Sequence, residues 1–101
     1  MRLMIMFDLP VDTTAHRRSY RQFRKAIINE GFVMMQFSIY VRVCPNRKSA
    51  AILEKHIALI APEDGVIQSL IVTEAQFQQM HYIRGDEGFD LSQASERTLI
   101  L

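Results

Sequence analysis

Runs of strand-like and helix-like hydrophobic spacing alternate along most of the chain. Residues 3–7 are apolar without a break, a pattern typical of a strand that is buried on both faces. Pro10 cannot donate a hydrogen bond to a neighbouring strand, so we expect this strand to end at about Asp8. The carboxylate then lies at a strand end, where sites are common in helix-covered sheets. The alternative is that Asp8 only caps a turn or the following helix.

Two amphipathic helices are predicted. The first runs from about Ala15 to Glu30, with capping residues at 12–14 and Gly31 at its carboxyl end. Helical spacing places four residues on its buried face: His16, Tyr20, Phe23 and Ile27. The second follows a cap at Asn46 or Ser49 and ends near Ile60. Its predicted buried face consists of Ile52, Leu53, His56, Ile57, Leu59 and Ile60.

Residues 32–43 are rich in strand formers and predict either one long bent strand or two strands broken near Gln36 and Phe37. They contain no Gly, Asn or Asp, so no tight turn is predicted. Residues 66–73 predict a further buried strand, and Thr73 is a cap for a single helical turn. Residues 80–84 predict a short strand.

The order of these elements predicts an α+β, ferredoxin-like βαββαβ fold formed by a single domain over residues 1–101. Polar residues 85–95 predict a mobile loop, and apolar residues 98–101 predict an extra C-terminal strand that pairs with a sheet edge, either its own or a partner's. Both helices would cover the same sheet face. We therefore expect a homodimer packed sheet to sheet, because the other face would otherwise expose apolar surface.

The charge distribution is uneven although the net charge is only +1. Residues 1–48 contain nine Lys/Arg against three Asp/Glu, and residues 49–101 contain three against eight. The first predicted helix carries five cations within nine residues: Arg17, Arg18, Arg21, Arg24 and Lys25. A merely solvated face usually mixes both signs of charge. This single-signed, arginine-rich face instead favours phosphate contact.

Several classes of chemistry are excluded. Cys44 is the only cysteine, so no internal disulfide or multi-cysteine zinc site can form. The sequence has no phosphate-binding glycine loop and no serine-hydrolase or zinc-protease motif. It also has no apolar run of membrane-spanning length and no signal peptide, so we expect a cytoplasmic protein with no membrane contact. One carboxylate is a poor Mg²⁺ site, whereas two Asp8 side chains across a dimer axis could activate water against a phosphodiester.

Four segments carry a family resemblance. They are Met-Ile-Met-Phe-Asp-Leu-Pro at 4–10, the arginine-rich 17–25, Gln-Phe-Ser-Ile-Tyr at 36–40 and Val-Thr-Glu-Ala-Gln-Phe at 72–77. Together they resemble the small CRISPR-associated adaptation protein family, in the style of its type II-A branch. Members are dimeric ferredoxin-like subunits that accompany the CRISPR integrase and are often described as endoribonucleases.

The resemblance implies a homodimer that bridges two integrase dimers and holds the double-stranded DNA prespacer during spacer acquisition in antiviral defence. It implies DNA-backbone contacts from Arg17, Arg18, Arg21, Arg24 and Lys25. It also implies that Asp8 is a catalytic Mg²⁺ ligand that faces its twin, since some members cleave RNA or double-stranded DNA. We favour the architectural role, with a magnesium-dependent endonuclease as the alternative. A small-ligand regulatory module is a third interpretation, supported by fold analogy alone.

Overall fold

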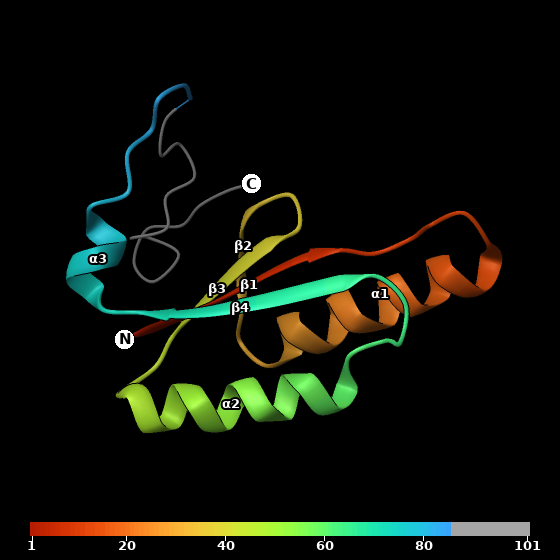
Figure 1. Cartoon of the computed structure of the whole chain (residues 1–101), viewed down its shortest axis with the longest axis horizontal. Helices are drawn as coiled ribbons and strands as arrows, with labels where there is room; N and C mark the ends of the chain where they lie inside the picture. Colours follow the sequence, from red (N-terminus) through yellow and green to blue (C-terminus); the bar gives the residue numbers. More distant parts are fainter. Residues whose placement is uncertain (86–101) are drawn as a thin grey trace.

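The computed structural model describes residues 1–85, which fold into one sheet with its two longer helices on one face (Figure 1). The four strands are antiparallel in the order β2-β3-β1-β4. The elements in chain order are β1 (Arg2–Asp8), α1 (Thr14–Asn29), β2 (Val33–Gln36), β3 (Ile39–Val43), α2 (Arg47–Ile60), β4 (Val66–Val72) and α3 (Glu74–Gln78). This α+β, ferredoxin-like arrangement confirms the predicted fold class.

The helix ends confirm the predicted caps. The Thr13 side chain accepts a hydrogen bond from the His16 amide at 3.0 Å and starts α1, while Gly31 follows the helix with a φ of 94°. A positive φ costs glycine little, which explains the residue type at this position. Asn46 caps α2 through the Ser49 amide, and Thr73 caps α3 in a reciprocal capping box with Gln76.

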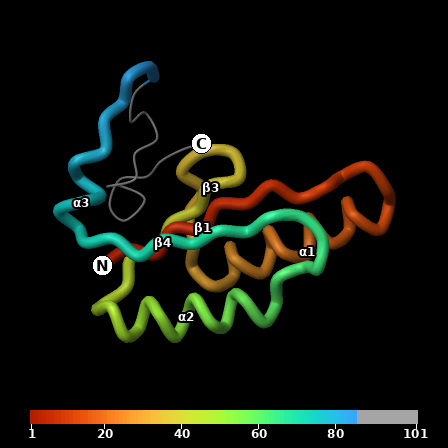
Figure 2. Tube along the Cα trace, viewed as in Figure 1, coloured from red at the N-terminus to blue at the C-terminus, as the bar shows by residue number. Residues whose placement is uncertain are grey.

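The core lies between β1 and the two helices. Leu3, Ile5 and Phe7 point to the helix side of β1, and Phe23 and Ile27 of α1 meet them there. The Phe7 ring meets Phe23 edge-on with 5.3 Å between centroids. Because β1 is the interior strand between β3 and β4, its burial confirms the predicted central position. Figure 2 shows β1 and β4 running side by side along this centre.

The 32–43 region forms two strands, which resolves the alternative left open by the sequence. The chain reverses in a tight turn at Phe37 and Ser38, although no turn residue predicts it. Ser38 adopts a φ of 66°, which costs a non-glycine residue about 1–2 kcal/mol. The Phe7 amide donates to the Ser38 carbonyl at 3.0 Å. This long-range bond helps to hold the strained turn.

Three sequence predictions about burial and strands are wrong. β4 is an edge strand, and its Val66 and Leu70 are 56% and 52% exposed, so it is not a buried strand. Only Leu53 and Ile57 of the predicted α2 face are buried, because α2 meets the sheet through a narrow stripe that also includes Ala50. The remaining residues of that predicted face are exposed: Ile52, His56, Leu59 and Ile60. Residues 80–84 form no strand.

The sheet face opposite the helices remains apolar. Val43, Val66 and Leu70 lie opposite Arg2, Asp8 and Met4 in register, and all three are more than half exposed. That a second copy of the chain covers this face stays a prediction. The predicted mobile loop beyond Gly85 and the C-terminal strand lie outside the described residues. No helix within residues 1–85 is long and apolar enough to cross a membrane.

Candidate nucleic-acid interface and the Asp8 site

Asp8 is the last residue of β1 and is exposed. It pairs with Val66 of β4 in the antiparallel register. Side chains alternate between the two faces of a strand, and Phe7 points into the core beneath the helices. The carboxylate of Asp8 therefore projects from the face opposite α1 and α2.

Close packing fixes the backbone at Asp8 from two sides. On one side lies Gly65, whose φ is 100°; a Cβ there would lie 2.8 Å from the Asp8 carbonyl oxygen and 2.7 Å from Leu9 Cδ2. A side chain at this position would force the loop before β4 away from the strand end. On the other side, the Phe7 amide is bonded to Ser38 in the β2–β3 turn. Contacts within one chain thus hold the end of β1 in place.

One chain does not complete a magnesium site. A carboxylate oxygen suits a hard cation, but residues 1–85 contain no group of three or more His, Cys, Asp or Glu side chains that could hold a metal ion. Around Asp8, a single chain therefore offers one carboxylate, and water or another molecule would have to supply the remaining ligands of such an ion.

The five predicted phosphate-contact residues are all exposed on α1, which contains no Asp or Glu. They differ in their contacts. Arg24 donates from Nε to the Tyr40 hydroxyl at 2.8 Å, and Arg17 donates to the Val11 carbonyl at 3.1 Å and to Thr14 Oγ1 at 3.2 Å. Within residues 1–85, no hydrogen bond or ion pair is formed by the side chains of Arg18, Arg21 and Lys25.

We call these three unpaired residues, Arg18, Arg21 and Lys25, the outer stripe. Their spacing of three and four residues places them on one line along the helix. At about 100° per residue, that line lies opposite the buried Phe23 and Ile27. The outer stripe therefore points directly away from the sheet, whereas Arg17 and Arg24 lie on the flank of α1.

Asp8 and the outer stripe are not brought together by the fold. The carboxylate projects from the open sheet face, and the cations project outward from the helix layer on the other face. No contact within residues 1–85 joins them. The two features form separate surfaces of one chain.

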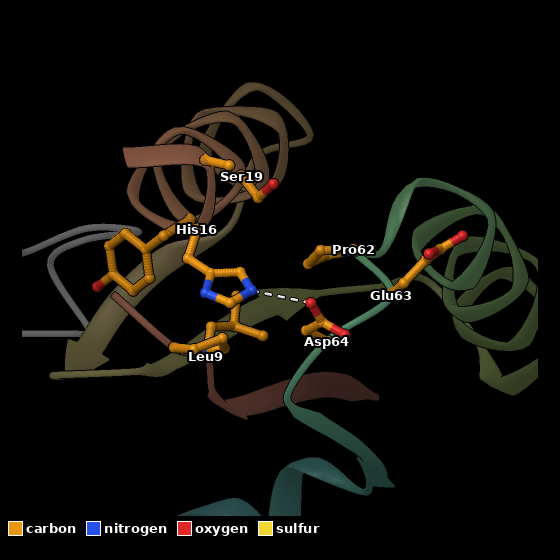
Figure 3. A pocket seen from close by; sticks show the side chains of 9 residues that line it. Leu9, His16, Ser19, Pro62, Glu63 and Asp64 are labelled. Carbon is orange, nitrogen blue, oxygen red and sulfur yellow. Dashed lines mark hydrogen bonds and ion pairs between the residues drawn. The ribbon is translucent and has the colours of Figure 1, made fainter. Parts of the chain in front are cut away.

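The sequence missed a third feature beside the end of β1. His16 was predicted on the buried face of α1, but its side chain is 28% exposed and contacts two carboxylates. It lines a cavity of about 360 Å³ with Leu9, Tyr20, Pro62, Glu63 and Asp64, among others (Figure 3). The spacing of Asp12 and His16 signals one contact from the sequence. The contact with Asp64, 48 residues away, has no such signal.

The charges around His16 act on one another. The hydrogen bond to Asp64, followed by that to Asp12, raises the pKa of His16 above its ordinary value of 6.5. The hydrogen bond from His16 is the main cause that lowers the pKa of Asp12. The cluster therefore favours the protonated form of His16, a cation held between two anions.

Residues 1–80 match the family model described as CRISPR associated protein Cas2. The chain belongs to the Cas2 family. It is 54% identical, over the full length of both chains, to proteins named CRISPR-associated endoribonuclease Cas2 from Lacticaseibacillus rhamnosus and Ligilactobacillus salivarius. A protein of the same name from Streptococcus mutans is 37% identical over the whole chain and 93% of its own length.

The Cas2 fold is also seen in a solved structure. The crystal structure of Streptococcus pyogenes Cas2 at pH 6.5 matches with a TM-score of 0.60 and covers 80% of this chain and 96% of its own. The identity is 14%, so this likeness concerns the fold alone. It agrees with the ferredoxin-like arrangement described above.

Proposed function

We propose that the protein is an architectural, double-stranded DNA-binding subunit of a CRISPR spacer-acquisition complex. The observation that carries this proposal is the outer stripe, in which three unpaired cations project from a helix without acidic residues. Unpaired cations can neutralise phosphates without first breaking an ion pair within the protein. Membership in the Cas2 family supports the assignment to a CRISPR system.

The stripe has dimensions suited to a nucleic-acid backbone. From Arg18 to Lys25 the helix advances about 10 Å, at about 1.5 Å per residue. One DNA strand advances about 3.4 Å along the duplex axis per phosphate, so the stripe spans about three phosphates. Contacts of this type position a duplex and carry no sequence information. Binding with little sequence preference is what a subunit that holds varied prespacers requires.

A homodimer would present two such stripes. Packing two copies through the open faces would bury Val43, Val66 and Leu70, which are exposed in one chain. The helix layers would then lie on the outside, with one stripe on each outer surface. This assembly leaves both basic surfaces exposed and available to duplex DNA, and we propose two integrase dimers as the further protein partners.

The binding test compares two triple variants. Alanine at Arg18, Arg21 and Lys25 should weaken duplex binding strongly. Alanine at Arg47, Lys48 and Lys55 removes the same charge from exposed positions of α2 and should change affinity much less. Equal losses in both variants, or no loss in the first, would contradict binding through the outer stripe.

A second candidate function is a magnesium-dependent endonuclease acting on RNA or double-stranded DNA through paired Asp8 residues. It is favoured by the rigid, exposed position of Asp8 and by the name endoribonuclease that the relatives carry. In such a site, bound Mg²⁺ would supply charge neutralisation and water activation. The protein's own contribution is to fix the Asp8 backbone between β4 and the β2–β3 turn.

The paired-site proposal has a sharp test. Asp8→Asn should abolish Mg²⁺-dependent cleavage while melting temperature and oligomeric state stay unchanged. Heterodimers with one Asp8→Asn subunit should also lose cleavage, because the site needs both carboxylates. Glu54→Gln, a carboxylate change on α2, is the control and should retain cleavage. Cleavage by the Asp8→Asn homodimer would contradict this candidate.

A further inference from the structure

His16 connects the two loops that lie on either side of Asp8. Its Nδ1 lies 2.5 Å from Asp12 Oδ1, in the loop between β1 and α1. Its Nε2 lies 2.8 Å from Asp64 Oδ2, in the loop between α2 and β4 (Figure 3). Asp64 immediately precedes Gly65, which packs against the Asp8 carbonyl. One imidazole thus joins the β1–α1 loop, which follows Asp8, to the α2–β4 loop, which packs against Asp8.

This geometry requires a doubly protonated ring. A neutral imidazole has one N–H and one lone pair, so it can donate to only one of the two carboxylates. The other carboxylate would then face a lone pair at hydrogen-bond distance, which is repulsive. Both contacts are satisfied together only when both nitrogens carry protons. The bridge between the loops therefore exists as an imidazolium between two carboxylates.

The remaining charged groups around His16 leave this bridge intact. Tyr20 lies on the same helix, and Glu63 lines the same cavity from the α2–β4 loop, with its carboxylate directed away from the imidazole (Figure 3). The guanidinium of the neighbouring Arg17 is held by Val11 and Thr14. Within residues 1–85, the charged groups that are hydrogen-bonded to the ring are thus the two carboxylates.

We infer that His16 is a positioning residue for Asp8: its imidazolium ties the two flanking loops together, and its deprotonation releases them. Release would free the loop that carries Gly65 from the strand end and would allow the Asp8 backbone to move. The effect on the loops stands without any catalytic activity. Its consequence for cleavage rests on the proposed paired-Asp8 site.

The pH range of the bridge follows from the two shifted groups. His16 has a raised pKa in the folded protein, so its stabilisation is fully present below pH 6.5 and is lost as the pH rises through the raised value. Asp12 has a lowered pKa, so its contribution is present above 3.8 and is lost as the pH falls through the lowered value. The bridge therefore holds between the lowered pKa of Asp12 and the raised pKa of His16, and it opens as the pH rises through the latter.

The experiment measures backbone carbon order parameters by NMR in residues 9–13 and 62–65 at pH 6 and at pH 9. In the unaltered protein, the order parameters of both loops should fall as the pH rises. His16→Gln should show low order parameters at pH 6 and little pH dependence. Asp64→Asn should lose loop order in the same way, because it removes the distant end of the bridge.

The matched control is His56→Gln. Within residues 1–85, His56 forms one polar side-chain contact, with Glu30 Oε2 at 3.1 Å, away from these loops, so this variant should keep the original pH profile. An identical profile in the unaltered protein, His16→Gln and Asp64→Asn would overturn the inference. Because loop order is measured without nucleic acid or metal, absence of cleavage in all variants would contradict only the paired-Asp8 function.

Discussion

The Arg24 guanidinium donates a hydrogen bond from Nε to the hydroxyl of Tyr40 at 2.8 Å. Tyr40 is only 1% exposed, so this contact ties the flank of α1 to β3 of the sheet. The contact separates one arginine of the basic helix from its neighbours. Arg24 has a structural role, whereas the outer stripe is left available for a partner.

Arg24→Ala should lower the free energy of unfolding by about 1–2 kcal/mol, because it leaves the buried Tyr40 hydroxyl without this donor. Arg21→Ala should change it by no more than about 0.5 kcal/mol, as expected for an exposed residue without contacts. Urea denaturation of both variants provides the comparison. In a Tyr40→Phe background, Arg24→Ala should lower the free energy of unfolding by less, because the hydroxyl that Arg24 contacts is already absent. Equal losses of unfolding free energy in Arg21→Ala and Arg24→Ala would contradict a structural role that is specific to Arg24.

Gly65→Ala should destabilise the protein by about 2 kcal/mol or more, since it combines an unfavourable φ with a clash against the Asp8 carbonyl. Gly85→Ala is the matched control, because Gly85 also has a positive φ of 84° but nothing lies within 4 Å of its added Cβ. The control should cost only the backbone term, about 1 kcal/mol. Similar melting temperatures for the two variants would show that close packing at Asp8 contributes little.

Arg2 and Glu74 should give a pH-dependent stability. Glu74 accepts two hydrogen bonds from Arg2 at 2.8 Å, and this pairing is the main cause of its lowered pKa. A carboxylate with a lowered folded pKa stabilises the protein above its ordinary value of 4.5 and loses this effect as the pH falls through the lowered value. Glu74→Gln should therefore be less stable at pH 7 and nearly equal at pH 2. A constant difference at both pH values would contradict this account.

The open sheet face predicts a change in oligomeric state. Leu70→Glu places a charge among apolar residues that a second copy would bury, and it should shift the protein to monomer in sedimentation experiments. Ile52→Glu is the control, because Ile52 is also exposed but lies on α2. Loss of the dimer in the α2 variant alone would place the interface on the helix layer.

Local signals made the first half of the fold predictable. β1, α1 and the caps at Thr13 and Asn46 depend on neighbouring residues, and their predicted positions are confirmed within one or two residues. The β2–β3 turn could not be predicted, because Ser38 adopts its conformation with the help of a hydrogen bond from Phe7. The prediction of a broad buried face on α2 was wrong for a related reason. Helical spacing marks apolar positions but does not show how broad the contact with the sheet is.

The candidate site was predictable in its residue types and less so in its organisation. The exposed strand-end carboxylate of Asp8 and the arginine-rich helix follow from sequence pattern. Arg24 differs from the unpaired cations of the outer stripe because it is bonded to Tyr40, which lies 16 residues away. The bridge through His16 depends on Asp64, 48 residues away. A pairing over such a separation leaves no periodic signal in one sequence.

The most direct test of the architectural role is the salt dependence of duplex binding. Each neutralised phosphate contributes about 0.9 to the slope of log affinity against log salt concentration. Replacing the outer stripe (Arg18, Arg21 and Lys25) with alanine should reduce the steepness by about 2.7 for each engaged chain. The triple variant at Arg47, Lys48 and Lys55 should retain the original slope. An unchanged slope without the outer stripe would contradict the account.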